Sequence, residues 1–550
     1  MLREFINQLE KLPQKVMANA LELNTDKPVI GVIVAESKQV FSHRNLDQIA
    51  ERVEMGIVEE GGTFLRMYVT AIDTTAMSGS NWSKYDLPMR DLVADNVEAI
   101  ASNDFFDGLV FVASEPNCVA GMLLGAIRTN IPSMFVCGGT MSPIMYNGTE
   151  QGFTHLYRQI AKVKTGETDF ELISSIENNT PLIAGTDCSR FGANSFNCAL
   201  ETIGLALSGN GTAPAMSRQR LEIARKTGNA AVKAAMDKLT PRRMVTPIAL
   251  LNAVIADLAC GGSSTTMLNI IAIGKELSYK NISLKSIGDI AKSTPKLLCD
   301  KKDGTALINQ FNRAGGMYAM LKQLADEKLI NLESATYNGT LQSVLKNVEI
   351  ADNEVIRSSE NCHNETSTLR VLYGNVAEEG AFVHYKGEGA FVGNARIYHN
   401  EESAIDALLH REIRPQDVIV IQNEGPKSCP GMREIYAVLA LIEGMGLQGK
   451  VAVITDGRIA DFYDGIVVGH ITPETNEHST FAVLQDGDVI EISIAKGKIN
   501  CDIKSKDLQI RLRDYDNHNV NYANHYLKKW SRMTGTASDG CFTKTAKGKQ

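Results

Sequence analysis

The sequence predicts an α/β protein with two domains: an N-terminal domain built on a parallel sheet, with a helical segment, and a C-terminal β-barrel-like domain. Three observations carry this prediction. Strand-like apolar runs first alternate with helical stretches, helical periodicity then takes over, and short β-rich runs dominate the end of the chain. A polar stretch at 350–367 separates the last two regions, so we place the domains at residues 1–365 and 366–550.

The alternating region extends from Lys27 to about Pro143. Its predicted strands are residues 28–35, 64–72, 107–113 and 131–139. Strands that alternate with helices form a parallel sheet covered on both faces, and ligands bind at the carboxyl ends of such strands. Asp73, Glu115 and Gly139 all follow strands and are therefore expected at that edge.

The helical segment, from Asn194 to about Leu345, carries apolar residues at three- and four-residue spacing. Beyond the polar stretch, eight short runs have β-strand character and are separated by glycine-containing turns; they are residues 369–375, 380–387, 390–398, 417–424, 451–457, 465–471, 488–495 and 498–504. Many short strands with such turns indicate a barrel or a sandwich.

Composition excludes several classes of function. With 56 Lys+Arg against 64 Asp+Glu, a formal charge of -8 and 6% aromatic residues, the chain has no basic face or stacking platform for nucleic acid. The N-terminal residues contain no apolar signal region, and no uninterrupted apolar span suits a membrane. The ten cysteines form no CxxC pair, so we expect a cytoplasmic protein with reduced thiols.

Two glycine-rich turns are candidates for substrate binding. They are CGGTMSP at 137–143, which contains Gly139, and CGGSSTTM at 260–267, which contains Ser263 and Ser264. Backbone N–H groups at helix starts hold carboxylate or phosphate. The same residues are also ordinary helix caps and tight turns, so both interpretations stay open.

These turns and several longer segments together resemble the dihydroxy-acid dehydratase and 6-phosphogluconate dehydratase family. The resemblance runs from about Pro28 to Thr543. It is carried by residues 121–141, 193–215, 252–272, 374–383, 417–435, 451–474 and 526–543. It implies a homodimer with a site between an α/β domain and a barrel-like domain. The implied reaction removes water from a 2,3-dihydroxy carboxylate, giving a 2-keto acid, with the help of an iron–sulfur cluster, Mg²⁺ and a serine base.

The cluster positions of the family are largely altered in this chain. Ser42 stands at the first cysteine, and EPNCVAG places Glu115, Pro116 and Asn117 at the Cys, Asp and Lys of the second motif. In the third, DCSRFGAN keeps Cys188 but with altered spacing. A cluster needs several thiolates, so the usual [2Fe–2S] cluster is not expected.

The magnesium set is partly kept, and the base is lost. Asp73 and Glu424 match two acidic positions of the family, and Glu115 could supply a third oxygen ligand for Mg²⁺ or another divalent cation. The motif ITDGRIADF places Ala460 at the base serine. Alanine cannot accept a proton, so the neighbouring Asp461 is the candidate replacement base.

Three hypotheses follow. In the first, the chain is a cluster-free lyase acting on a hydroxy acid, with Glu115 as a metal ligand or general acid and Asp461 as base; Glu115 could instead only fill polar space, paired with Arg190. In the second, the chain is a non-catalytic ligand-binding or structural paralogue. In the third, it is a conventional dehydratase whose cluster is held by the relocated ligands Cys118, Cys137 and Cys188.

Overall fold

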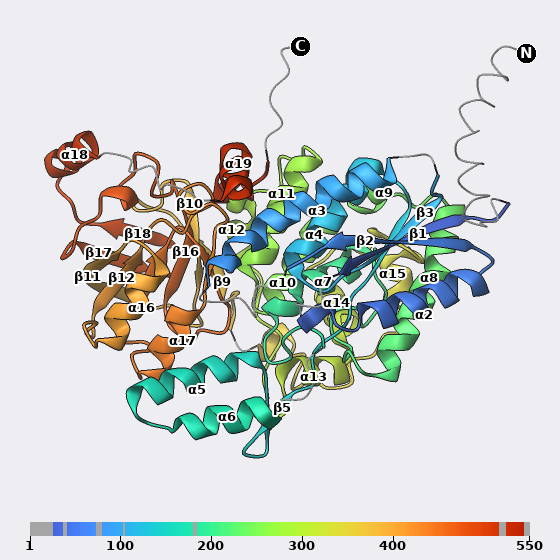
Figure 1. The fold of residues 1–550 in the computed structure, drawn as a ribbon, viewed down its shortest axis with the longest axis horizontal. Helices are drawn as coiled ribbons and strands as arrows, with labels where there is room; N and C mark the ends of the chain where they lie inside the picture. Colours follow the sequence, from blue (N-terminus) through green and yellow to red (C-terminus); the bar gives the residue numbers. More distant parts are fainter. Residues whose placement is uncertain are drawn as a thin grey trace, which may run out of the picture.

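The computed structural model describes residues 26–36, 41–72, 80–102, 105–179, 184–362, 364–515 and 524–543. Within them, the N-terminal half contains a parallel sheet with helices, and the C-terminal part contains a barrel-like sheet beside it (Figure 1). Among these residues, none of the helices combines the length and the apolar character needed to cross a membrane.

The N-terminal sheet has the strand order β2-β1-β3-β4 and is parallel throughout. Its strands are β1 (Val29–Glu36), β2 (Thr63–Thr70), β3 (Gly108–Val112) and β4 (Ser133–Val136). Every residue of β3 and β4 is buried. This explains their uninterrupted apolar sequences, because helices cover both faces of a parallel sheet.

Two closely packed helix pairs accompany this sheet (Figure 1): α2 (Leu46–Glu59) with α8 (Arg218–Met236), and α3 (Asp86–Ala101) with α4 (Pro116–Thr129). Glycines allow the first pair to approach closely. A Cβ atom on Gly56 would lie 1.9 Å from the backbone oxygen of Arg225, and one on Gly228 would lie 2.0 Å from that of Val53. The crossing of α2 and α8 therefore requires glycine on both helices.

Further helices follow in the N-terminal half. The longer ones are α5 (Phe153–Thr165), α6 (Phe170–Asn179), α7 (Gly192–Ile203), α10 (Pro247–Ala259), α11 (Ser264–Glu276), α12 (Leu284–Ala291) and α14 (Gly316–Asp326). The shorter ones are α9 (Pro241–Met244), α13 (Leu307–Arg313) and α15 (Leu341–Leu345). Side-chain caps fix several starts: Thr246 accepts from the N–H of Ala249 at α10, and Ser263 accepts from that of Thr266 at α11.

The C-terminal sheet has eight strands in the order β18-β17-β11-β12-β14-β16-β10-β9. They are β9 (Leu369–Leu372), β10 (Gly380–His384), β11 (Ala390–Tyr398), β12 (Asp417–Ile421), β14 (Ala452–Thr455), β16 (Val467–Thr472), β17 (Val489–Ser493) and β18 (Lys498–Cys501). A bridge between Tyr373 and Lys498 brings the two edge strands together, so the sheet is nearly closed. This closure leaves few unpaired edge groups.

Alternation along the barrel strands explains its core. Val418 and Val420 of β12 belong to the cluster that fills the barrel, whereas Ile419 and Ile421 belong to the larger core shared with the helices. Two helices, α16 (Glu401–Leu409) and α17 (Ala437–Gly444), connect the parallel strands β11, β12 and β14. These two helices were not predicted among the β-rich runs.

Two short strands, β13 (Glu434–Ile435) and β15 (Arg458–Ile459), pair in parallel on the barrel domain. The last α-helices of the described residues are α18 (Ser505–Asp514) and α19 (His525–Met533).

The predicted fold class is confirmed: the N-terminal sheet is parallel, and the eight predicted β runs form the barrel-like sheet. The alternative of a sandwich is not what the chain forms.

Gly228→Ala tests the packing of α2 against α8. The added methyl group would meet the backbone of Val53, so we expect the free energy of unfolding to fall by about 1–3 kcal/mol, although alanine is otherwise the better helix former by about 1 kcal/mol. Urea unfolding followed by circular dichroism measures the change. Gly389→Ala is the control, because nothing lies within 4 Å of its added Cβ. Equal stability of the two variants would contradict the close approach of the helices.

Candidate active site

A cavity lies between the N-terminal half and the barrel domain. The starts of α4, α7 and α11 reach it, with Glu115 and Ser263 as N-cap residues that line it. The barrel domain contributes His384, Glu434 and the segment 458–461. The lining leaves about 830 Å³ of space between its atoms, open solvent included. Because N–H groups at helix starts favour negative charge, three converging starts suit an anionic ligand.

The cavity brings together four of the predicted site residues: Glu115, Ser263, Ser264 and Asp461. Gly139 is not among the lining residues. Its backbone oxygen accepts a hydrogen bond from the N–H of Thr186 at 3.0 Å, and Thr186 does line the cavity. Gly139 therefore supports the wall from behind. Asp73 lies outside the described residues, so its position relative to the cavity stays a prediction.

Glu115 is 4% exposed and lies in the short connection between β3 and α4. Its Oε1 accepts a hydrogen bond from Ser42 Oγ at 2.9 Å. The family resemblance expects cluster cysteines at the positions of Ser42 and Glu115. These two residues are in contact, and both line the cavity. Arg190, which was considered as the partner of Glu115, pairs with Asp461 instead.

Ser263 and Ser264 connect the cavity wall to its surroundings. Ser263 caps α11, and its N–H donates to Asp257 Oδ2 at 2.8 Å. Ser264 Oγ donates to the backbone oxygen of Ile459 at 3.3 Å, which joins α11 to β15. Burial raises the pKa of Asp257 to about 7, although Ser195 and the N–H of Ser263 lower it. The two serines therefore have a structural role even without a ligand.

Arg190 and Asp461 form an ion pair at the cavity. Nη1 of Arg190 lies 3.1 Å from Asp461 Oδ1, and the N–H of Gly192 donates to Asp461 Oδ2 at 2.7 Å. Both carboxylate oxygens are thus engaged, one by a guanidinium and one by the start of α7. The guanidinium of Arg190 also lies over the ring of Tyr436, 5.3 Å from its centroid. Its buried Nε has no hydrogen-bond partner among the described residues.

Arg458 holds the second buried positive charge. It is 1% exposed, and its Nη2 lies 2.5 Å from Asp86 Oδ2. Its Nε donates to the backbone oxygen of Met432 at 2.9 Å, and its Nη1 lies 3.7 Å from Glu434 Oε2. Glu434 in turn lies 3.8 Å from Nη1 of Arg190. Burial raises the pKa of the Glu434 carboxyl, whereas Arg190 and Arg458 act to lower it.

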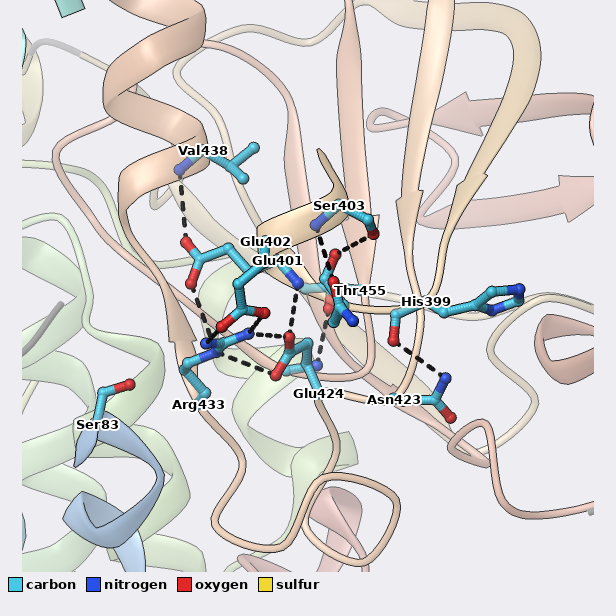
Figure 2. A network of polar contacts seen from close by, with 12 residues as sticks. Ser83, His399, Glu401, Glu402, Ser403, Asn423, Glu424, Arg433, Val438 and Thr455 are labelled. Carbon is cyan, nitrogen blue, oxygen red and sulfur yellow. Dashed lines mark hydrogen bonds and ion pairs between the residues drawn. The ribbon is translucent and has the colours of Figure 1, made fainter. Parts of the chain in front are cut away.

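Glu424 lies away from this cavity. Figure 2 shows it beside Arg433, together with Glu401 and Glu402. Its side chain is fully buried, and its Oε1 accepts from the N–H of Glu401 at 2.8 Å. Within the described residues, Glu424 therefore holds α16 and the segment before β13 together. Its predicted role as a metal ligand remains a prediction.

The cysteines do not converge at the cavity. Cys188 is fully buried in a small cluster with Met141 and Ile144, and Cys118 is buried in the main core. Cys137 donates its thiol hydrogen to the backbone oxygen of Asn210 at 2.6 Å. Burial raises the pKa of all three thiols. No cysteine lines the cavity among the described residues, so these residues do not fit an iron–sulfur cluster there.

The family resemblance also implies a magnesium ion, which needs oxygen ligands. Among the residues that the structure describes, no three His, Cys, Asp or Glu side chains are grouped so that they could hold a metal ion. Asn117, at the position of the family lysine, donates to Asp86 at 2.6 Å and accepts from Asn269 at 3.0 Å. The described residues therefore do not complete a magnesium site.

Several lining residues were missed by sequence reasoning. They are Asp187, His384, Glu434 and Arg458. Glu434 and Arg458 lie in the segments 417–435 and 451–474, which resemble the family, so these segments held a usable signal. His384 carried no such signal, because a single histidine in a strand is most often an ordinary buried residue.

Family profiles match both halves of the chain. Residues 27–344 match the family profile described as Dihydroxy-acid/6-phosphogluconate dehydratase N-terminal, and residues 354–541 match its C-terminal counterpart. A dihydroxy-acid dehydratase of Caldanaerobacter subterraneus subsp. tengcongensis is 34% identical over 543 residues, 97% of each chain. One of Acetivibrio thermocellus is 33% identical, again over 97% of each chain. One of Pyrococcus abyssi is 33% identical over 97% of this chain and 98% of its own.

A parallel α/β half and a barrel-like half enclose the cavity, and the relatives that this chain resembles over nearly its whole length are dehydratases. The chain belongs to the dihydroxy-acid/6-phosphogluconate dehydratase family.

Arg458→Gln tests the buried charge network. The change leaves Asp86 buried without its cation, so we expect the free energy of unfolding to fall by about 3–5 kcal/mol. Urea unfolding provides the measurement, and the double variant Asp86→Asn/Arg458→Gln should recover part of the loss. Arg225→Gln, which removes only pairs with Glu59 and Glu222 near the surface, is the control and should leave stability unchanged. A stable Arg458→Gln variant would show that the network is dispensable.

Proposed function

We propose that this protein is a hydro-lyase that removes water from a 2,3-dihydroxy or related hydroxy carboxylate in the cavity, without the usual iron–sulfur cluster. One observation carries the proposal: the cavity joins an incompletely paired guanidinium, Arg190, to carboxyl groups at Glu115 and Asp461. A guanidinium can bind the anionic substrate, and the two carboxyl groups can take part in the two proton transfers.

The substrate carboxylate is proposed to bind near Arg190. The buried Nε of this residue has no partner among the described residues, and a buried donor without an acceptor is costly. A carboxylate would satisfy it and would also lie close to the N-terminal ends of α7 and α11. Arg458 lines the same cavity and contributes positive charge there, while its Nε and Nη2 bind Met432 and Asp86.

Glu115 and Asp461 are proposed to serve the two halves of the elimination. Hydroxide is a poor leaving group, so Glu115, as a buried carboxylic acid, would protonate the departing C3 hydroxyl and release it as water. Asp461 would assist the removal of the C2 proton. The electron pair of the C2–H bond then forms the C2–C3 double bond, and the resulting enol becomes the 2-keto acid.

Metal content decides between this proposal and its alternatives. Purified anaerobically, the protein should contain neither iron nor acid-labile sulfide near stoichiometry. Both in stoichiometric amounts would overturn the cluster-free proposal and support relocated thiolates. Magnesium or manganese that is bound by the wild type and lost in the Asp73→Ala/Glu424→Ala variant would support the predicted metal ligands.

The predicted homodimer is tested separately, by measuring the mass of the protein in solution with light scattering.

Glu115→Gln tests the reaction itself. We expect wild-type protein to convert 2,3-dihydroxybutanoate or a larger 2,3-dihydroxy acid to the 2-keto acid, and Glu115→Gln to lower kcat by about 10²-fold or more, because the amide cannot donate a carboxyl proton. The 2-keto acid is measured as its hydrazone. Glu412→Gln, an exposed position before β12, is the matched control and should behave like wild type. Binding without turnover by the wild type would instead indicate a ligand-binding paralogue.

A further inference from the structure

A second cavity adjoins the first, and His384 lines both. Arg190 and Asp461 also line both cavities, so these residues stand between the two spaces. His384 is the last residue of β10, and only 7% of it is exposed. The reaction outlined above makes no use of this imidazole.

The hydrogen bonds around His384 define its neutral form. Its Nε2 lies 3.5 Å from Thr368 Oγ1, and that hydroxyl donates its single hydrogen to the backbone oxygen of Gly261 at 2.6 Å. Thr368 can therefore only accept from the imidazole, which places the ring hydrogen on Nε2. Nδ1 then carries a lone pair. It is buried and has no hydrogen-bond partner among the described residues.

The charges that act on His384 come from several elements. Asp461 and Asp464 favour its protonated form, and Lys296 and Lys386 disfavour it. Burial is the largest influence and lowers the pKa of His384 to about 4, so the ring is neutral at pH 7. A bound carboxylate would add negative charge nearby and raise this pKa toward neutrality.

We propose that His384 accepts the C2 proton of the substrate at Nδ1, and that Asp461 stabilises the imidazolium that forms. The inference rests on the proposed dehydration and assigns its proton acceptor. Both oxygens of Asp461 are engaged, one by Arg190 and one by the N–H of Gly192. The buried Nδ1 of His384 has no hydrogen-bond partner among the described residues, and this residue lines the cavity. The proton moves from C2 to Nδ1, the C2–H electron pair forms the double bond, and the C3 oxygen leaves as water with a proton from Glu115.

His384→Gln and His384→Ala test this role, with 2,3-dihydroxybutanoate as the probe. We expect kcat to fall by about 10²-fold or more in both variants while KM changes less than threefold, since a proton acceptor acts in the transition state. Added imidazole should restore part of the activity of His384→Ala. Exchange of the C2 hydrogen with deuterated water should be lost together with turnover. His410→Gln, at the exposed C-cap residue that follows α16, is the matched control.

Failure of the inference and failure of the proposed function can be told apart. Wild-type turnover combined with a His384→Gln variant within threefold of it would overturn the inference and leave the function standing. If the wild type has no turnover, the imidazole NMR resonance that disappears in His384→Gln provides the second readout on addition of 2,3-dihydroxybutanoate. A shift of this resonance without turnover would overturn the proton-transfer role. An unchanged resonance would overturn both proposals.

Discussion

The burial of Arg458 is the constraint on which the rest of the site depends. Removing a guanidinium from water costs several kcal/mol, so the residue is tolerated only where every partner is in place. Asp86 comes from the N-terminal half, whereas Met432 and Glu434 come from the barrel domain. The ion pair therefore couples the docking of the two halves to the formation of the cavity. Separation of the halves would therefore leave Asp86 and Arg458 without each other as ion-pair partners.

The same coupling sets the charge of the cavity. Arg190 and Asp461 come from opposite halves, and the N–H of Gly192 completes the contact. A Cβ on Gly192 would lie 2.4 Å from Asp461 Oδ2, so a larger residue at this position would displace that carboxylate. The guanidinium of Arg190 and the N-terminal ends of α7 and α11 therefore line the same cavity as Glu434 and Asp461. Such a space favours an anionic ligand whose own charge replaces part of an existing ion pair.

The described residues at the family's cofactor positions form hydrogen bonds with one another. Ser42 donates to Glu115, and Asn117 joins Asp86 to Asn269. The carboxyl group of Glu115 suits the acid–base chemistry on which the proposed elimination depends. The neutral imidazole of His384 adds a proton-accepting group at the same cavity.

The sequence by itself determined the strands, most of the helices and the family, because hydrophobic periodicity and local motifs reflect burial within each element. The resemblance to the dehydratase family also predicted that Glu115 and Asp461 belong to one site. Only the tertiary structure separated Glu424, which is enclosed by Arg433, from Glu434, which faces the cavity in the same motif. Local pattern cannot make this distinction, since the direction of each acid depends on which buried cation lies nearest. Arg433 is held within the barrel domain by Glu401, Glu402 and Glu424. Arg190, in contrast, approaches Glu434 only because two halves that lie far apart in the sequence dock together.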